Sequence, residues 1–251
     1  MKRMIKISLI LLLVGMAVIA AVPFFKEKEA EKKSENGFKE IQESVTDKED
    51  KTINVEKLKR ENEDCIGYLE VPGTSISYPI MQTRDNPDYY LNHDFNKNYS
   101  FYGTPYLSAY CDLKKSDNLI IYGHNINGGK MFGYLEKYKE EAFFSTHRSG
   151  MLYLPKQAYE IEIFAFIDTN AHDKLVFRPN QTTWENQGQL LDYIAEKALW
   201  RTEEYPQGGE KILGMSTCDS GNTDGRYVIF ARIIDTVEGG KADVARQENE
   251  E

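Results

Sequence analysis

The stretch KILGMSTCDSGNTDGRYVIFARI, Lys211 to Ile233, holds two apolar runs on either side of a short polar segment. Its second run is rich in Tyr, Val, Ile and Phe, residues that suit a half-buried strand. The segment between the runs, DSGNTDG, consists of turn-forming residues, and its two glycines permit a positive φ. We therefore predict an antiparallel hairpin in which Cys218 ends the first strand and Arg226 begins the second.

Cys218 and Arg226 are expected to lie at the same end of this hairpin. Neighbouring strands are about 5 Å apart, so the two side chains can face a common cleft. A lone cysteine after a strand is more often a packed, small hydrophobic residue than a nucleophile. An arginine at the start of a strand is more often a solvated charge. A base beside the thiol would favour the catalytic interpretation.

The candidate base is His124, in the sequence NLIIYGHNINGG. It follows the apolar run Leu119 to Tyr122 and precedes a glycine-rich segment, so it repeats the pattern of strand, reactive residue and loop found at Cys218. The other histidines occur in polar contexts that indicate surface positions: His93, His147 and His172. We predict that His124 is the histidine that meets Cys218.

Cysteine, histidine and arginine together can carry out acyl transfer through a thioester. A thiol becomes a strong nucleophile when an imidazole takes its proton or pairs with the thiolate. A guanidinium stays charged and can hydrogen-bond an oxyanion or a substrate backbone. The candidate catalytic residues are therefore His124, Cys218 and Arg226. Arg232 lies six residues further along the same strand, roughly 20 Å away, and is expected to take no part.

The composition argues against several classes of protein. The chain has 251 residues, of which 41% are hydrophobic, enough for one sizeable core. A net charge of -9 argues against a nucleic-acid partner. The three cysteines form no CxxC pair, and nothing favours a disulfide between Cys65 and Cys111. Thioester chemistry requires no metal or cofactor, and we expect neither. The acidic residues are numerous enough to leave a calcium site open, but they show no ordered spacing of the EF-hand type.

The N-terminal segment has the features of a membrane anchor. Ile7 to Phe25 is an apolar run without a charge, close to the ~20 residues that a helix needs to cross a bilayer. Three basic residues precede it, which keeps the N-terminus in the cytoplasm and places the rest outside. We expect an uncleaved, single-pass anchor in the cell membrane and an extracytoplasmic catalytic domain. A cleaved signal peptide, with small residues around Ala17 to Ala21, is the alternative.

Four regions are expected along the chain. Residues 1–25 are the anchor, and residues 26–53 are a stalk rich in Lys and Glu. Residues 54–237 form the catalytic domain, and residues 238–251 are a polar tail that we expect to be disordered.

Many short strands with sparse helices predict a closed or nearly closed β-barrel. Besides the hairpin, the expected strands are Ile66–Val71, Ser75–Met81, Thr104–Leu107, Asn118–Tyr122, Met151–Leu154 and Ala158–Ile167. The expected helices are Asn54–Asn62, Phe132–Tyr138 and Trp184–Trp200.

The motifs around the three candidates resemble those of the sortase family. STC after an apolar strand, an arginine that opens the next strand and YGHN upstream resemble the sortase signature, and RYVIFARII resembles the end of a sortase. IGYLEVPGTSISYPIMQTRDNPDYYLNHDF and a helix between Phe166 and Cys218 resemble the class B branch. The resemblance covers about Val55 to Asp235. It departs where LGMSTC replaces the common TLSTC, which is expected to alter the shape of the pocket and not the chemistry.

The resemblance implies an eight-stranded sortase-like barrel, mostly β, with a few peripheral helices, including one inserted before the cysteine strand. It also implies a membrane-anchored cysteine transpeptidase of Gram-positive-type cell walls. Cys218 would attack a C-terminal sorting motif of a secreted protein, and a peptidoglycan cross-bridge or pilin amine would resolve the thioester. His124 would transfer protons, and Arg226 would bind the oxyanion or the substrate backbone. The implied substrate-binding residues are Tyr122, Ser216, Asn86 and Leu91.

Three other interpretations stay open at this point. An extracellular Cys/His peptidase that hydrolyses wall peptides would use the same residues with water as the acceptor. A surface adhesin without activity would keep Cys218 as a packed thiol. A Cys/His metal-binding domain is the weakest of the three, because no ligand pair lies at the spacing of a metal site.

Overall fold

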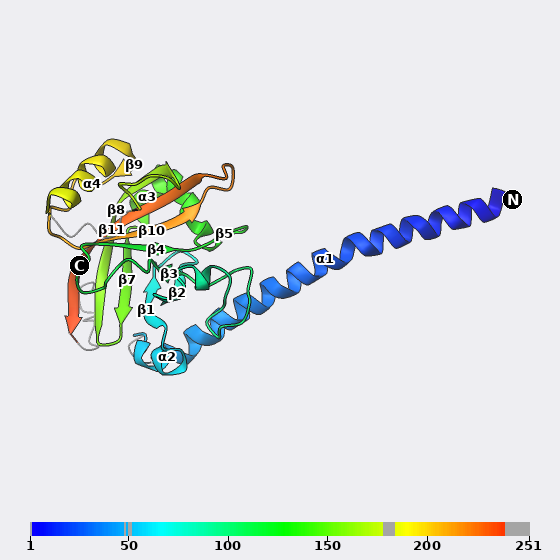
Figure 1. Cartoon of the computed structure of the whole chain (residues 1–251), viewed down its shortest axis with the longest axis horizontal. Helices are drawn as coiled ribbons and strands as arrows, with labels where there is room; N and C mark the ends of the chain where they lie inside the picture. The colour runs from blue at the N-terminus through cyan, green and yellow to red at the C-terminus, as the bar shows by residue number, and fades with distance from the viewer. Residues whose placement is uncertain (1, 48, 50–51, 178–183, 239–251) are drawn as a thin grey trace, which may run out of the picture. The chain divides into compact units, whose positions relative to one another are not determined.

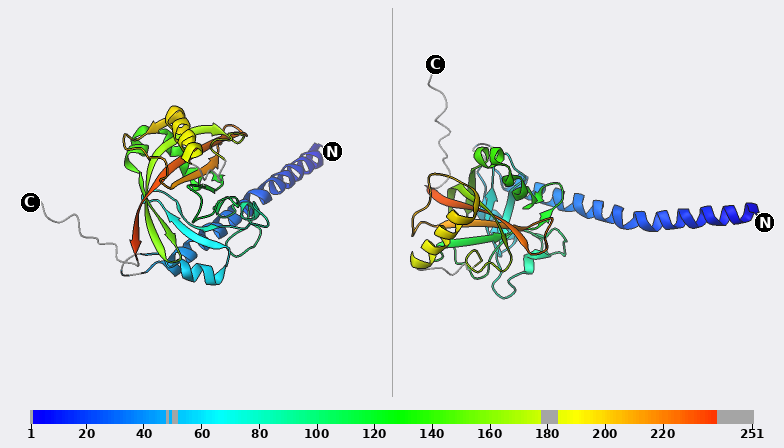
Figure 2. Two further views of the ribbon diagram at one scale, coloured as in Figure 1. Left: turned by 60° about the vertical axis from the view of Figure 1, so that its left-hand side comes forward. Right: turned by 90° about the horizontal axis from the view of Figure 1, so that it is seen from above.

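Eight strands form a closed barrel in which each strand is hydrogen-bonded to two neighbours (Figures 1 and 2). The computed structural model describes residues 2–47, 49, 52–177 and 184–238. Around the barrel the strand order is β11-β10-β4-β3-β2-β1-β7-β8, and a β11–β8 pairing closes it. The strands are β1 Cys65–Glu70, β2 Ser77–Met81, β3 Tyr106–Leu107, β4 Asn118–Tyr122, β7 Ser149–Leu154, β8 Gln157–Asn170, β10 Ile212–Cys218 and β11 Gly225–Glu238. The predicted eight-stranded, mostly β barrel is confirmed.

Two of the strand pairs in the barrel are parallel, β4 with β10 and β2 with β3, and the others are antiparallel. The β4–β10 pair joins segments that are far apart in the sequence. Parallel strands end at the same edge of a sheet, so β4 and β10 finish side by side. Because β11 is antiparallel to β10, its first residues lie at that edge too. Three strand ends therefore meet at one rim of the barrel.

The strands form where the sequence is rich in β-branched and aromatic residues, which pack well on a pleated surface. One part of the core lies between the barrel and helix α4, Trp184–Lys197. Leu190, Leu191 and Ile194 of α4 are buried against strand residues such as Phe164 and Phe230. Each such side chain contributes about 1.5–3 kcal/mol by burial.

The helix predicted over Trp184–Trp200 ends earlier than expected. After Lys197 the chain becomes strand β9, Ala198–Arg201, which pairs with β8 outside the closed ring. Trp200 lies opposite Phe166 of β8, and Leu199 is exposed instead of packing with the helix. Pairing with β8 has overridden the local preference for a helix in these last residues.

Several short elements complete the described chain. The segment predicted as a helix near Phe132 is a 3-10 helix, η2 Gly133–Lys139. The remaining elements were not predicted: η1 Tyr89–Leu91, β5 Asn125–Ile126, β6 Lys130–Met131 and α3 Glu141–Thr146.

The short helix expected at Asn54 is confirmed as α2, Val55–Glu61. The side chain of Asn54 accepts a hydrogen bond from the Lys57 amide, which satisfies one of the free donors at the helix start. The compact unit that contains the barrel begins at Gln42. Val45 and Ile53 are buried in this unit, so packed residues occur ahead of Asn54.

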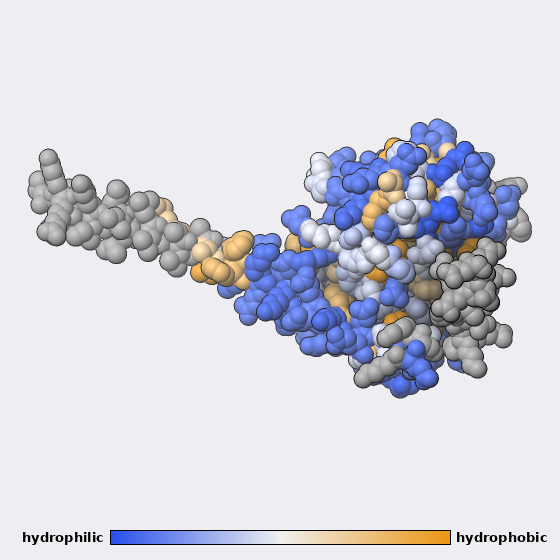
Figure 3. Space-filling view, turned by 180° about the vertical axis from the view of Figure 1, so that it is seen from behind, coloured by the Kyte–Doolittle hydropathy of each residue, from blue (hydrophilic) through white to orange (hydrophobic). Residues whose placement is uncertain are grey.

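The first helix, α1, runs over Lys2–Val45 and has Pro23 within it. Much of the expected membrane anchor, the side chains of residues 7–15, 17, 18 and 20, lies outside the described residues. Among the side chains that are described, several large apolar ones at this end of the helix are exposed: Met16, Ile19, Val22, Phe24 and Phe25. Beyond them the surface of α1 changes from hydrophobic to hydrophilic (Figure 3).

The Lys- and Glu-rich stretch expected to be a stalk is helical up to Val45. Lysine and glutamate are good helix formers, and Lys28 pairs with Glu31 one turn away at 2.8 Å. In the described part of the chain, no helix combines the length and the apolar character needed to span a membrane. Of the expected polar tail, residues 238–251, Glu238 is the last residue of β11, and residues 239–251 lie outside the described residues.

Candidate active site

Cys218 and Arg226 lie directly opposite each other across the β10–β11 hairpin. The predicted hairpin and its register are thus confirmed. Opposite residues of an antiparallel pair present their side chains on the same face, with Cβ atoms about 4.5–5.5 Å apart. Cys218 is exposed, although the strand before it is buried from Ile212 to Thr217. The thiol therefore leaves the packed sheet at the rim of the barrel.

His124 is brought to the same rim by the parallel pairing of β4 with β10. Tyr122 is the register partner of Ser216, and the Gly123 amide donates to the Ser216 carbonyl at 3.1 Å. Continuing this register by two residues sets His124 level with Cys218. The prediction that this histidine and this cysteine meet at neighbouring strand ends agrees with the pairing.

Two hydrogen bonds hold the chain around His124 against the chain around Cys218. The Thr217 hydroxyl donates to the Gly123 carbonyl at 2.8 Å. The side-chain amide of Asn125 donates to the Cys218 carbonyl, also at 2.8 Å. Residues on both sides of His124 are thus tied to the end of β10. Asn125 was not singled out from the sequence, although it is the residue that directly follows His124.

The glycine before His124 has a packing reason. A Cβ atom at Gly123 would lie 2.6 Å from the ring of Phe132, which is completely buried. The Phe132 amide in turn donates to the His124 carbonyl at 2.9 Å. The absence of a side chain at position 123 lets this ring pack beneath the turn that carries the histidine.

The imidazole of His124 is half-buried and contacts the segment between β2 and β3. Its Nε2 atom lies 2.7 Å from the Leu91 carbonyl oxygen. Its ring is stacked on that of Phe101, with centroids 6.2 Å apart and planes 9° from parallel. Leu91 was expected at the site from the resemblance, and Phe101 was not predicted.

The guanidinium of Arg226 is turned onto its own hairpin loop. It donates to the carbonyl oxygens of Thr223, at 3.2 Å, and Gly225, at 2.7 Å. Within the described ranges no carboxylate forms an ion pair with Arg226. Its positive charge is therefore not neutralised by any described carboxylate at the rim.

A row of aromatic rings leads away from the rim over β3 and β4. The ring centroid of Tyr122 lies 5.6 Å from that of Tyr106 and 6.2 Å from that of Phe177. Burial raises the pKa of Tyr122 to about 12. Burial and the nearby carboxylate of Asp88 raise the pKa of Tyr106. Both phenols stay protonated near neutral pH and can donate hydrogen bonds.

Tyr106 lies in the predicted strand Thr104–Leu107, observed as β3, but it was not singled out as a site residue because its contacts with β4 and Asp88 join segments far apart in the sequence. Its hydroxyl donates to Asp88 at 3.2 Å, which links β3 to the segment that holds the predicted residue Asn86. Asn86 itself is exposed, and its carbonyl accepts hydrogen bonds from Thr83 and Tyr89 of its own turn. Asn86 is thus connected to the site only indirectly, through the turn that carries Asp88, the hydrogen-bond partner of Tyr106.

The Ser216 hydroxyl is buried next to the site and has no hydrogen-bond partner in the described structure. It lies between Tyr122 of β4 and Val228 of β11. A buried hydroxyl without a partner costs roughly 1–3 kcal/mol, so a group that binds here could recover part of that cost.

The other cysteines are unlike Cys218. Cys65 and Cys111 are completely buried and are not joined by a disulfide. Burial raises the pKa of Cys65 to about 12 and that of Cys111 to about 11, so both stay protonated near neutral pH. Cys218 is the exposed thiol of the three.

The other histidines are accounted for by local contacts. His93 stacks on Tyr89 and His147 on Phe143, each at 3.9 Å between centroids. His172 is exposed in a turn after β8. In the part of the chain that the structure describes, no three His, Cys, Asp or Glu side chains are grouped closely enough to hold a metal ion.

Comparison with known proteins places this chain in a family. The family model described as the sortase domain matches residues 69–234. Sortase B of Listeria monocytogenes is 31% identical over 186 residues, which cover 70% of this chain and 72% of the relative. Sortase B of Staphylococcus aureus is 29% identical over 185 residues, which cover 71% and 74%.

Solved structures give the same result. The Staphylococcus aureus sortase B–substrate complex has a TM-score of 0.74 and 25% identity, and the match covers 81% of this chain and 97% of that one. Clostridium perfringens sortase B has a TM-score of 0.67 and 31% identity, with 72% and 99% covered. The chain belongs to the sortase family, whose members are cysteine transpeptidases.

Proposed function

We propose that this protein is a membrane-anchored transpeptidase that cleaves a C-terminal sorting motif of secreted proteins and joins the acyl part to a cell-wall or pilin amine. The observation that carries the proposal is the rim of the barrel. There an exposed thiol, Cys218, lies opposite Arg226, which has no ionic partner among the described residues. His124 lies two residues beyond Tyr122, the register partner of Ser216, and so follows the neighbouring strand end.

In the first half-reaction the Cys218 sulfur attacks the carbonyl carbon of the scissile peptide bond. The thiol proton passes to His124 before or during the attack. Charge then develops on the carbonyl oxygen, and Arg226 is the cation placed to bind it or to fix the adjacent substrate backbone. The C–N bond breaks, and the leaving amine takes a proton from the imidazolium, which leaves a thioester on Cys218.

In the second half-reaction an amine attacks the thioester carbon. His124 accepts the proton that the amine loses, the C–S bond breaks and the thiolate is regenerated. The balance is one peptide bond broken and one formed, so no cofactor or energy source is consumed. Water would serve as the acceptor in the same geometry, so the chemistry of transfer and of hydrolysis differs only in the nucleophile.

The proposed substrate groove follows the aromatic row beside the rim. Tyr122 and the buried hydroxyl of Ser216 lie on neighbouring strands and could bind polar groups of an extended peptide. The side chain of Leu91 is proposed to border the groove, because its carbonyl is already occupied by His124. Asn86 is proposed to border it from the turn that Asp88 links to Tyr106.

The proposed location is the outer face of the cell membrane of a Gram-positive organism. Support comes from the charge-free apolar run at residues 7–25 and the basic residues before it. The described side chains of this run include exposed large apolar groups, and such surface is normally covered by a partner or a membrane. Deletion of residues 2–25 is expected to move the protein from the membrane fraction to the soluble fraction of expressing cells. Retention in the membrane after the deletion would contradict the anchor.

The function is tested by incubating the full chain, in detergent, with a library of peptides and measuring the intact mass of the protein. We expect one covalent acyl adduct on Cys218 for peptides that carry the sorting motif, and none for Cys218→Ala. When a primary amine is also present in the incubation, it should be found joined to the acyl part of the peptide in the released product. Release of only the free acid at every amine concentration would indicate a hydrolase. An unmodified, unreactive Cys218 with every peptide would indicate a protein without this activity, such as an adhesin.

A further inference from the structure

We infer that the imidazole of His124 is held in its working orientation by two groups from one loop, the ring of Phe101 and the carbonyl of Leu91. Phe101 is then a positioning residue that acts through His124. The inference rests on the proposed function, because it assigns a means of orientation to the proposed acid–base group. The pair formed by the Phe101 ring and the Leu91 carbonyl is called the imidazole clamp below.

The Leu91 carbonyl determines which nitrogen of the ring carries a proton. The Nε2 atom of His124 lies 2.7 Å from this oxygen, and a carbonyl oxygen can only accept a hydrogen bond. Nε2 must therefore be the donor, so a neutral His124 has its lone pair on Nδ1. The partner of one ring nitrogen sets the role of the other. Nδ1 is thus the atom left to exchange a proton with Cys218 or with an amine.

The ring of Phe101 holds the face of the same imidazole. The two rings are 9° from parallel with centroids 6.2 Å apart, which is an offset stack. Phe101 is 65% exposed, so it contributes little to the core. A large apolar side chain held at the surface beside a reactive histidine is explained by this contact and not by burial.

One turn brings both parts of the clamp into place. The Gly103 amide donates to the Ser100 carbonyl at 3.1 Å, which closes a tight turn with Phe101 inside it. Gly103 has a φ of +59°, and a Cβ atom there would lie 2.5 Å from the Leu91 carbonyl oxygen. Glycine is needed at this position for the backbone conformation and for the close approach. The same turn therefore exposes Phe101 and allows the Leu91 carbonyl to sit where it meets His124.

The chain offers a matched control for Phe101. Tyr99 lies two residues earlier in the same loop and is 77% exposed. Its ring contacts His93, with centroids 6.4 Å apart, and not His124. Removal of either ring deletes an exposed aromatic group from one loop, but only one of the two groups touches the proposed acid–base residue.

The experiment measures the rate at which iodoacetamide alkylates Cys218 in the full chain at pH 7, followed by intact mass. This probe needs no knowledge of the peptide substrate, and the thiols of Cys65 and Cys111 are expected to react much more slowly because they are buried. The variants are His124→Ala, Phe101→Ala, Phe101→Tyr, Tyr99→Ala and the double variant His124→Ala/Phe101→Ala. Thermal unfolding confirms that each variant is folded.

We expect Phe101→Ala to lower the alkylation rate of Cys218 by most of the factor that His124→Ala does. Phe101→Tyr should react at close to the wild-type rate, because the ring stack is kept. Tyr99→Ala should react like the wild type. In the His124→Ala background, Phe101→Ala should cause no further loss, since the residue acts through the histidine. With the sorting peptide as substrate, the single variant Phe101→Ala should have a kcat lower on the order of 10²-fold and a KM that is nearly unchanged.

Three outcomes would overturn the inference. If Cys218 is alkylated at the wild-type rate in Phe101→Ala but slowly in His124→Ala, the imidazole clamp is rejected and the proposed function is left intact. An equal loss in both backgrounds shows that Phe101 acts on Cys218 or on the fold and not through the histidine. A His124→Ala rate equal to the wild type removes the role of His124 itself, and the inference falls with it.

A second variant tests the Leu91 half of the clamp. Gly103→Ala should displace the carbonyl and change the ¹⁵N shifts of His124 from those of a ring protonated at Nε2 to those of a mixture. Gly128→Ala is the control, because Gly128 also has a positive φ, of +78°, but a Cβ atom there would meet nothing closer than 3.9 Å. Unchanged His124 shifts in Gly103→Ala, or the same change in both variants, would reject the role of the carbonyl.

Discussion

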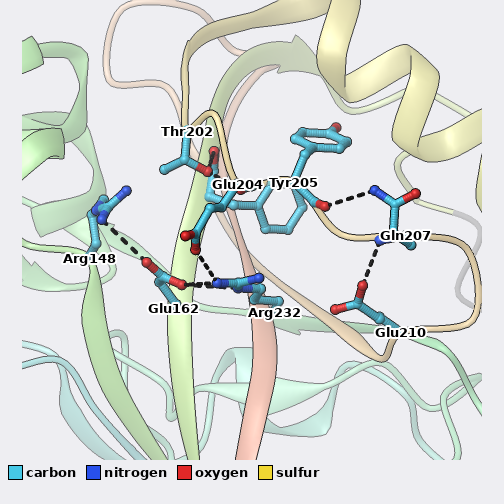
Figure 4. Close-up of polar contacts among 9 residues, drawn as sticks. Arg148, Glu162, Thr202, Glu204, Tyr205, Gln207, Glu210 and Arg232 are labelled. Atoms are coloured by element: carbon cyan, nitrogen blue, oxygen red, sulfur yellow. Dashed lines mark hydrogen bonds and ion pairs between the residues drawn. The ribbon is translucent and has the colours of Figure 1, made fainter.

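Two arginines on strand β11, Arg226 and Arg232, differ in what surrounds them. Arg226 lies at the rim opposite Cys218, and its guanidinium bonds only to the carbonyl oxygens of its own loop among the described residues. Arg232 lies opposite Ile212, near the other end of the pairing with β10. There it donates to the carboxylates of Glu162 and Glu204, each at 2.7 Å (Figure 4).

The network around Arg232 joins several elements of the barrel. Glu162 of β8 also pairs with Arg148, which lies just before β7, so one carboxylate bridges two arginines (Figure 4). Glu204 belongs to the segment between β9 and β10. This segment is fixed to α4 because the Tyr205 hydroxyl donates to the Leu191 carbonyl at 2.7 Å. Arg232 is thus occupied by structural partners.

The difference between the two arginines shows how the same residue type on the same strand can serve two purposes. A cation whose partners are carboxylates of its own fold stabilises that fold. A cation left without a carboxylate beside an exposed thiol keeps its charge available for a substrate. The two positions are six residues apart, roughly 20 Å along a strand, so only Arg226 is within reach of chemistry at Cys218.

The largest expected effect tests whether the rim carries the chemistry at all. His124→Ala should lower the rate of acyl-enzyme formation about 10²–10⁴-fold, the usual contribution of a general acid–base group. His172→Ala is the control, because His172 is exposed in a turn and shares no contact with the rim in the described structure. Single-turnover mass spectrometry gives both rates. A comparable loss at His172 with normal activity at His124 would contradict the assignment.

The next effect separates the two arginines by activity. Arg226→Lys should lower kcat for peptide cleavage on the order of 10²–10³-fold, because an ammonium cannot reproduce the guanidinium fork at a developing oxyanion. Arg232→Lys should cleave at close to the wild-type rate. Equal losses of activity in the two variants, or a lower kcat in Arg232→Lys than in Arg226→Lys, would contradict the separate roles of the two arginines.

The reverse contrast is expected in stability. Arg232→Ala should lower the free energy of unfolding by about 1–3 kcal/mol, because the half-buried Glu162 loses a charged hydrogen-bond partner. Arg226→Ala removes only contacts to its own loop and should cost about 0.5 kcal/mol. Urea denaturation of both variants measures the difference. A larger loss at Arg226 would mean that the rim arginine is also a structural residue.

The smallest effect sharpens the contrast between the rim and the packed interior, and it depends on pH. At pH 8 one thiol per folded chain, Cys218, should react with iodoacetamide, and all three should react after unfolding. Burial raises the pKa of Cys111 from 9.0 to about 11 and that of Cys65 from 9.0 to about 12. Their protonated forms are favoured by folding, so this contribution to stability is complete below pH 9 and declines as the pH rises above it. Counts of alkylated thiols between pH 8 and 10 check the prediction, and early labelling of Cys65 would contradict it.

Most of the strands and the reactive residues could be predicted from the sequence because their signals are local. Apolar runs, turn residues and a cap at Asn54 act over a few positions, so β4, β10 and α2 were located close to their true bounds. The register of the β10–β11 hairpin also follows from local information, since a short loop leaves few ways to pair its flanking strands. The opposition of Cys218 and Arg226 was therefore determined by the sequence.

Other features depended on the tertiary structure. The parallel pairing of β4 with β10 that sets His124 level with Cys218, the closure of β8 onto β11 and the addition of β9 join segments far apart in the chain. Such pairings are selected by the burial of whole faces and by the closure of the barrel, which no local pattern encodes. The contacts of Phe101 and of the Leu91 carbonyl with His124 arise in the same way, because a loop without regular structure takes its position from the surfaces on which it packs. The sequence by itself thus determined which groups could react, and only the tertiary structure decided which of them meet and what holds them there.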